Sequence, residues 1–256
     1  MTRLYALHCG GETIDRATLD PFDADVGSKI QIPYFFYVVD HPDGHVLFDT
    51  GAHRDFIDHP ERLGPAAEYW EIDMSEGDHL AGKLRTLGLE PEQIKHAAIS
   101  HLHYDHSGGV GELPNAAIYV QEEELRFAHY PPVYQRDIYV KWTFDKVSNW
   151  KALRGDYDVF NDGTVILFRT PGHTPGHQSM LVRTDNQALI LAGDAIYDLA
   201  KMRQRALPGV VWRADEIVES WEAIEEYERK FGAQILITHE LGWRTKIRVG
   251  PELWYD

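Results

Sequence analysis

The chain has 256 residues, of which 43% are hydrophobic and 26% charged, and its formal charge is −16. This is the composition of a globular protein. Its acidity argues against nucleic acid and anionic membranes as binding partners, because both are bound mainly by clustered Lys and Arg. Cys9 is the only cysteine, which excludes an internal disulfide and a cysteine-rich zinc site. No apolar run reaches the roughly 20 residues that span a bilayer, and no signal peptide is visible. We therefore expect one cytoplasmic domain over residues 1–256.

The first half of the chain predicts a β-hairpin and a helix. We treat residues 8–30 as an N-terminal loop. The hairpin consists of a buried strand at 34–39, turn residues at 41–44 and a returning strand at 45–49. Residues 76–89 predict a helix, because Leu80, Leu84 and Leu87 share one face and Gly88 is a stop signal.

The second half alternates strands with helices. Strands are predicted at 96–100, 165–168, 179–182, 188–192 and 234–237, and helices at 121–129 and from Asp215 to Phe231. Hairpins followed by strand–helix alternation fit an α/β or α+β domain in which two sheets are covered by helices on their outer faces.

The segment Ser100–His106 contains the densest group of metal-ligand residues. It follows a predicted strand, so His101 and His103 point to the same side. The turn signalled by residues 107–109 lets Asp105 and His106 face a second point nearby. Burying these side chains together without a metal would cost desolvation free energy with nothing to offset it. The segment therefore predicts a metal site.

Three further residues complete the candidate ligand set. His173, Asp194 and His239 each lie just beyond the C-terminal end of an apolar strand, where the sites of α/β proteins assemble. The loop of His173 also contains His177. Histidine and carboxylate donors suit Zn²⁺ well, and Fe, Mn and Co are compatible.

The order H-x-H-x-D-H, P-G-H, G-D and T-H resembles the metallo-β-lactamase superfamily, and Asp49-Thr-Gly51 resembles another of its motifs. The resemblance covers nearly the whole chain. It implies an αβ/βα sandwich with two divalent metal ions at one edge. It assigns one metal to His101, His103 and His173, the other to Asp105, His106 and His239, and a bridging position to Asp194. It also implies that His177 is a supporting residue and that Asp49 orients a ligand histidine or its loop.

Within the superfamily, the sequence is most similar to the N-acyl homoserine lactonases. The shared motifs are His101–Gly109, Thr170–Ser179 and Asp194-Ala-Ile-Tyr197. The tyrosine three residues after the bridging aspartate discriminates this group. His103 stands where flavin-linked di-iron members have Glu, and Asp194 stands where one class of antibiotic-degrading members has Cys. One departure is Thr238-His-Glu240, where the group commonly has G-H-D.

This resemblance implies a quorum-quenching hydrolase that opens the lactone ring of N-acyl homoserine lactones with water activated between two metals. Tyr197 would donate a hydrogen bond to the carbonyl oxygen, and Asp105 would pass a proton to the leaving alkoxide. The alternative substrates are another small lactone, a thioester or a phosphotriester. A non-catalytic binder is disfavoured because it needs none of the seven ligands.

The aromatic residues of segment 127–150 have three interpretations at this point. They line an acyl pocket, form a dimer face or pack as an ordinary part of the core. Residues 207–212 are another candidate wall of the pocket. The sequence leaves open whether the chain forms a homodimer and which acyl-chain length it prefers.

Overall fold

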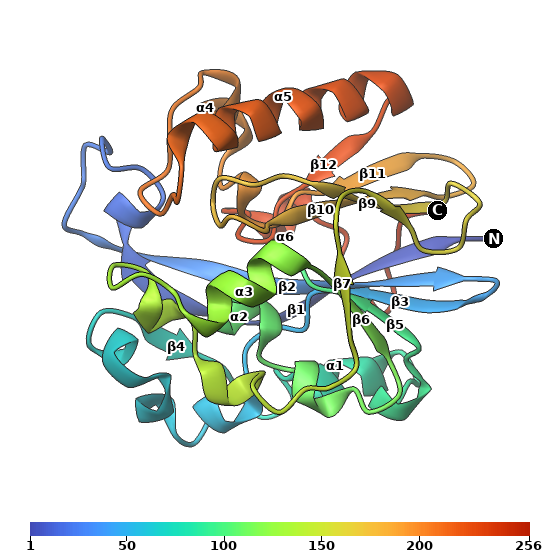
Figure 1. Ribbon diagram of the computed structural model, residues 1–256, viewed down its shortest axis with the longest axis horizontal. Coiled ribbons are helices and arrows are strands. Elements are labelled where there is room, and N and C mark those ends of the chain that lie inside the picture. The colour runs from blue at the N-terminus through green and yellow to red at the C-terminus, as the bar shows by residue number, and fades with distance from the viewer.

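The computed structural model describes residues 1–256 as two β-sheets packed face to face, with helices on their outer faces (Figure 1). The predicted αβ/βα sandwich is confirmed. In spatial order, the seven-stranded sheet contains β4 (Glu71–Asp73), β1 (Arg3–Asp15), β2 (Lys29–His41), β3 (Gly44–Phe48), β5 (His96–Ala98), β6 (Ala117–Gln121) and β7 (Trp150–Leu153). The five-stranded sheet contains β12 (Gln234–Leu236), β11 (Ala188–Leu191), β10 (Gln178–Arg183), β9 (Val165–Arg169) and β8 (Tyr157–Asp158).

Helices cover both outer faces of this sandwich. The α-helices are α1 (Leu80–Thr86), α2 (Tyr104–Ser107), α3 (Glu122–His129), α4 (Leu199–Arg203), α5 (Ala214–Phe231) and α6 (Trp243–Lys246). The 3₁₀ helices are η1 (Arg16–Thr18), η2 (Arg54–Phe56), η3 (Pro60–Glu68), η4 (Pro91–Gln93), η5 (Val110–Glu112), η6 (Arg136–Ile138), η7 (Lys141–Thr143) and η8 (Gly193–Ala195). Helix α5 lies over the five-stranded sheet, and α1 lies on the opposite side of the molecule (Figure 1). None of these helices has both the length and the apolar character needed to cross a bilayer.

The continuous apolar run of β2 reflects burial on both faces of its sheet. Successive side chains of a strand point to opposite faces. Phe35, Tyr37 and Val39 pack between the two sheets, whereas Tyr34 and Phe36 pack toward the helical layer. A strand buried on both sides needs no polar alternation, which is why residues 34–39 were recognisable as a strand.

The prediction of a loop over residues 8–30 is wrong for its first part. Residues up to Asp15 belong to β1, which pairs with β2 and β4. The register of β1 against β2 shifts between His8 and Gly11, and Gly10 has a φ of 97°. A Cβ on Gly11 would lie 2.3 Å from the carbonyl oxygen of Ile32. Glycines at such an irregularity remove the side-chain alternation that identifies a strand.

The aromatic segment 127–150 divides into buried and exposed residues. Tyr139 and Phe144 are buried in the core beneath the seven-stranded sheet, which confirms the packed interpretation for them. Tyr130 and Tyr134 are exposed, so a dimer face stays a prediction. The predicted helix at 76–89 is confirmed only in its centre, because α1 begins at Leu80 after a turn at Gly77 with a φ of 90°.

We expect Phe35→Ala to lower the free energy of unfolding by about 3–5 kcal/mol, because it leaves a cavity between the sheets. Phe22 is the matched control, since it is 90% exposed whereas Phe35 is fully buried. Phe22→Ala should stay within about 0.5 kcal/mol of the parent. Urea denaturation of the three proteins at equal metal content measures both values. Similar losses for the two variants would contradict the assigned core.

Candidate metal centre

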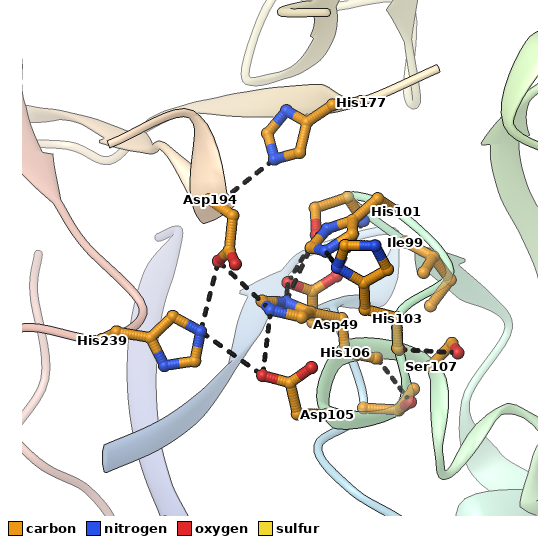
Figure 2. Close-up of polar contacts among 12 residues, drawn as sticks. Asp49, Ile99, His101, His103, Asp105, His106, Ser107, His177, Asp194 and His239 are labelled. Carbon is orange, nitrogen blue, oxygen red and sulfur yellow. Dashed lines mark hydrogen bonds and ion pairs between the residues drawn. The ribbon is translucent and has the colours of Figure 1, made fainter. Parts of the chain in front are cut away.

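The seven predicted ligands come together at one edge of the sandwich. Figure 2 shows His101, His103, Asp105, His106, Asp194 and His239 pointing toward one another. Residues 101–106 follow β5, the His173 loop connects β9 to β10, Asp194 follows β11 and His239 follows β12. The exposed fraction of every member lies between 0 and 7%. The structure therefore brings together all the candidates that the strand-end argument selected, namely His101, His103, Asp105, His106, His173, Asp194 and His239.

Three histidine nitrogens form the first group. His101 Nε2 lies 2.8 Å from His103 Nδ1, and His173 Nε2 lies 3.2 and 3.1 Å from these two atoms. Nitrogens held by one zinc ion at about 2.0–2.1 Å have separations of this order. Burial lowers the pKa of all three histidines. Neutral rings keep a lone pair available for a cation.

Two histidines and two aspartates form the second group. Asp105 Oδ2 lies 3.4 Å from the Nε2 atoms of His106 and His239. Asp194 Oδ1 lies 3.1 and 3.3 Å from the same two nitrogens. Burial opposes protonation of His239, but Asp194 and Asp105 raise its pKa to about 10. The carboxylates thus create a strongly negative environment that favours bound positive charge.

Asp194 connects the two groups through its two carboxylate oxygens. Oδ1 faces the second group, whereas Oδ2 lies 3.5 Å from His173 Nε2 in the first. Tyr197 donates a hydrogen bond to the same Oδ2 at 2.7 Å. The backbone N–H of Asp194 donates to His177 Nε2 at 3.1 Å, which agrees with a supporting role for His177. This arrangement places Asp194 where a bridging ligand would stand.

The unpaired atoms of the site fit a pair of divalent cations. His106 Nε2 and Asp194 Oδ1 are buried without a hydrogen-bond partner, although they lie close together (Figure 2). Buried polar atoms are normally paired, because an unpaired one carries its full desolvation cost. Cations held by the two groups would supply the missing partners.

The outer ring nitrogens of four of the five candidate ligand histidines have a hydrogen-bond partner in the chain, whereas His103 Nε2 has none. His101 Nδ1 lies 3.0 Å from Ser100 Oγ, and His106 Nδ1 lies 2.9 Å from Asp49 Oδ2. His173 Nδ1 donates a hydrogen bond to the carbonyl oxygen of Val210 at 3.1 Å, and His239 Nδ1 donates to that of Pro33 at 2.9 Å. Such contacts set ring orientation and tautomer.

Asp49 orients His106, as the sequence predicted. It also accepts hydrogen bonds from the backbone N–H and the hydroxyl of Ser100, at 2.7 and 2.9 Å. Burial raises the pKa of Asp49, and His106 opposes that rise. Its φ of 64° lies in the left-handed region, which aspartate tolerates better than most residues. Asp49 therefore fixes both the ring and the turn that precedes the ligand segment.

Glu124 on α3 is a supporting residue that the sequence did not reveal. Its carboxylate accepts hydrogen bonds from the backbone N–H groups of Leu102 and Gly176, at 2.9 and 3.2 Å. The hydroxyls of Thr174 and Tyr139 donate to it at 2.7 and 3.0 Å. Glu124 thus ties the His101–His103 segment to the His173 loop. Three consecutive glutamates in a short helix are typical of a solvent-facing surface, which concealed it.

A cavity opens onto the metal centre from the surface. Its wall contains five candidate ligands and Tyr197. The remaining residues are mostly apolar, and the full lining is Glu12, Ile14, Thr18, Ile32, Trp70, His103, Tyr104, Asp105, Ile138, His173, Asp194, Tyr197, Val210 and His239. Ile138 and Val210 belong to the segments 127–150 and 207–212, so both predicted wall segments reach the cavity.

Comparison with known proteins agrees with this geometry. The profile of the Metallo-beta-lactamase superfamily matches residues 32–233. The chain belongs to this superfamily. Relatives include the N-acyl homoserine lactonase AttM of Rhizobium radiobacter, 34% identical with 89% of each chain covered. The N-acyl homoserine lactonase of Bacillus cereus is 30% identical with 98% of each chain covered.

A superfamily member of known structure has the same architecture over its whole length. It is an N-acyl homoserine lactone hydrolase with the product N-hexanoyl-L-homoserine bound at its catalytic metal centre. The TM-score is 0.88 at 27% identity, with 98% of each chain covered. The chain is accordingly a metallo-hydrolase by family and fold.

We expect protein purified without chelator to contain close to two equivalents of metal. His239→Ala should preferentially lose the second metal, and His173→Ala should weaken the binding of the first metal, because each substitution removes a donor from one group. His41→Ala is the control, since His41 is buried but paired with Asp162 at 3.1 Å outside the site. Elemental analysis with chelator titration measures the losses. One equivalent in well-occupied parent protein would refute the two-metal assignment.

We also expect Asp49→Asn to lower the affinity for the second metal by about 10-fold to 100-fold, which is the usual effect of losing a residue that orients a ligand. Asp49 accepts from the Ser100 N–H with Oδ1 and from His106 Nδ1 with Oδ2, and an amide has only one acceptor oxygen for these two donors. Chelator competition at constant pH measures the affinity. Unchanged affinity would show that His106 is held by the turn alone.

Proposed function

We propose that this protein hydrolyses the lactone ring of N-acyl homoserine lactones, using two divalent ions bound by the seven residues, with Zn²⁺ the best match to the donors. The observation that carries the proposal is the position of Tyr197, which lines the cavity and touches the bridging Asp194. Support comes from the relatives named N-acyl homoserine lactonases. The similar hydrolase that holds an acyl homoserine product at its metal centre adds further support. Opening the ring of such a signal would be quorum quenching.

The residues that surround the reacting carbonyl have complementary roles. When bound, the two ions would polarise the carbonyl and lower the pKa of the attacking water. Burial, and next to it the charge of Asp194, raises the pKa of Tyr197 well above 10. Its phenol therefore keeps its proton and can donate a hydrogen bond to the oxygen on which negative charge develops.

Asp105 is ionised, in contrast to the protonated phenol of Tyr197. Burial alone would raise the pKa of Asp105, but His106 and His239 hold it well below its ordinary value. An ionised carboxylate at this place can accept the proton of the attacking water. It can then return that proton to the alkoxide that leaves when the ring opens. The product is a hydroxy acid.

An apolar groove beside the cavity provides room for an acyl chain. The groove has a volume of about 260 Å³ and is lined by Ala66, Tyr69, Trp70, Tyr134, Gln135, Asp137, Ile138, Gly209, Val210 and Val211. Trp70, Ile138 and Val210 border both the groove and the metal cavity. We infer that the ring occupies the cavity and the acyl chain the groove.

We expect Tyr197→Phe to retain the fold and both metals while lowering kcat on acyl homoserine lactones by about 10-fold to 100-fold. Loss of one donor to a developing oxyanion typically costs about 10²–10³ in rate, and here a metal shares the charge. Steady-state kinetics with metal-matched protein measures the effect. Full activity in the variant would remove Tyr197 from the mechanism.

We further expect the parent protein to prefer acyl homoserine lactones to linear thioesters and phosphotriesters. The metals act on all three classes, whereas the cavity and groove fit an acylated ring. A comparison of kcat/KM over the three classes with one metal-loaded preparation is the measurement. A better rate on thioesters or phosphotriesters would replace the lactonase proposal with a different dinuclear hydrolase.

A further inference from the structure

Glu12 places a carboxylate in the metal cavity without belonging to either metal group. It lies on β1, opposite Ile32 of β2 and Ile72 of β4, directly after the register shift at Gly11. Its exposed fraction is 6%, and it lines the same cavity as Asp105 and Tyr197. It is absent from every group of side chains that could hold a metal.

The carboxylate of Glu12 is only partly satisfied by the protein. Its Oε2 atom accepts a hydrogen bond from the hydroxyl of Tyr104. The buried hydroxyl of Tyr34, which has no other partner, is a second donor near the carboxylate. An ionised carboxylate has about four acceptor positions, and burial with few partners is costly. Glu12 therefore has unused acceptor capacity beside the metal centre.

The substrate carries a donor at a matching position. In an acyl homoserine lactone, the amide nitrogen is bonded to the ring carbon next to the reacting carbonyl. Its N–H therefore lies between the carbonyl at the metals and the acyl chain. Glu12 shares the cavity wall with the metal ligands and with Trp70 and Ile138, which lead into the apolar groove. A donor bound between the two regions faces this wall.

We propose that Glu12 is a specificity-determining residue that accepts a hydrogen bond from the amide N–H of the bound acyl homoserine lactone. This inference rests on the proposed function. It gives a function to a buried acid that lines the metal cavity but belongs to neither metal group. The interaction selects α-acylamino lactones over lactones that lack an N–H.

The test compares Glu12→Gln with the parent on two lactones. One is N-hexanoyl homoserine lactone, and the other is its carba analogue, in which CH₂ replaces the amide N–H. Glutamine has the same shape and still offers Tyr104 an acceptor oxygen, but it turns an NH₂ donor toward the substrate. A hydrogen bond to a charged group is worth about 1.5–3 kcal/mol, so kcat/KM on the amide should fall about 10-fold to 100-fold, mainly through KM. The carba analogue should be opened by both proteins at similar rates.

Tyr104→Phe separates this role from simple positioning. It removes the hydrogen bond that Tyr104 donates to Glu12 and keeps the carboxylate. The proposal expects this variant to retain the preference for the amide over the carba analogue. Circular dichroism and metal analysis of each variant confirm that fold and metals are intact.

The outcomes distinguish the two proposals. Equal losses of Glu12→Gln on both lactones, or a parent that does not discriminate between them, would overturn the role of Glu12 while leaving the lactonase function in place. A parent that opens neither lactone would overturn the proposed function itself, and the role of Glu12 with it.

Discussion

Desolvation of many ionisable side chains at one point is the constraint on which the rest of this structure depends. Five histidines and three aspartates are buried together at the edge of the two sheets. Such a cluster is stable only when every polar atom has a partner. The inward-facing atoms converge on two points, and two of the outward-facing nitrogens bind groups from distant segments, namely Asp49 and the carbonyl of Pro33. The sandwich must therefore close completely before the cluster is satisfied.

The parts of the fold that the sequence revealed are those with a repeating apolar pattern. Strand β2 is buried on both faces, and α5 buries Ile217, Trp221 and Ile224 at helical spacing. The ligands were recognisable because each follows such a strand. Strand β1 escaped prediction because two glycines and a register shift interrupt its alternation. A single sequence cannot show that such an irregular segment pairs over its whole length.

Two supporting carboxylates escaped prediction for a related reason. Glu124 looks like its neighbours in an acidic helix, yet its partners lie on two loops that are distant in the chain. Glu12 meets Tyr104 across 92 positions of sequence. A buried acid differs from an exposed one only in its three-dimensional surroundings, and local composition does not encode those. The candidate ligands come from short motifs, which a single sequence displays directly.

The order of the ligands along the chain has a consequence for synthesis. His239 follows His101 by 138 residues, which takes on the order of 10 s at typical rates of translation. In the first part of that interval, before His173 is made, the nascent chain presents the four candidate ligand residues of the 101–106 segment without those of the second sheet. Such a partial site holds cations with fewer donors and no bridging carboxylate, so it discriminates less between metals than the finished centre. The metal supply around the ribosome, as well as the mature geometry, therefore influences which ions are first captured.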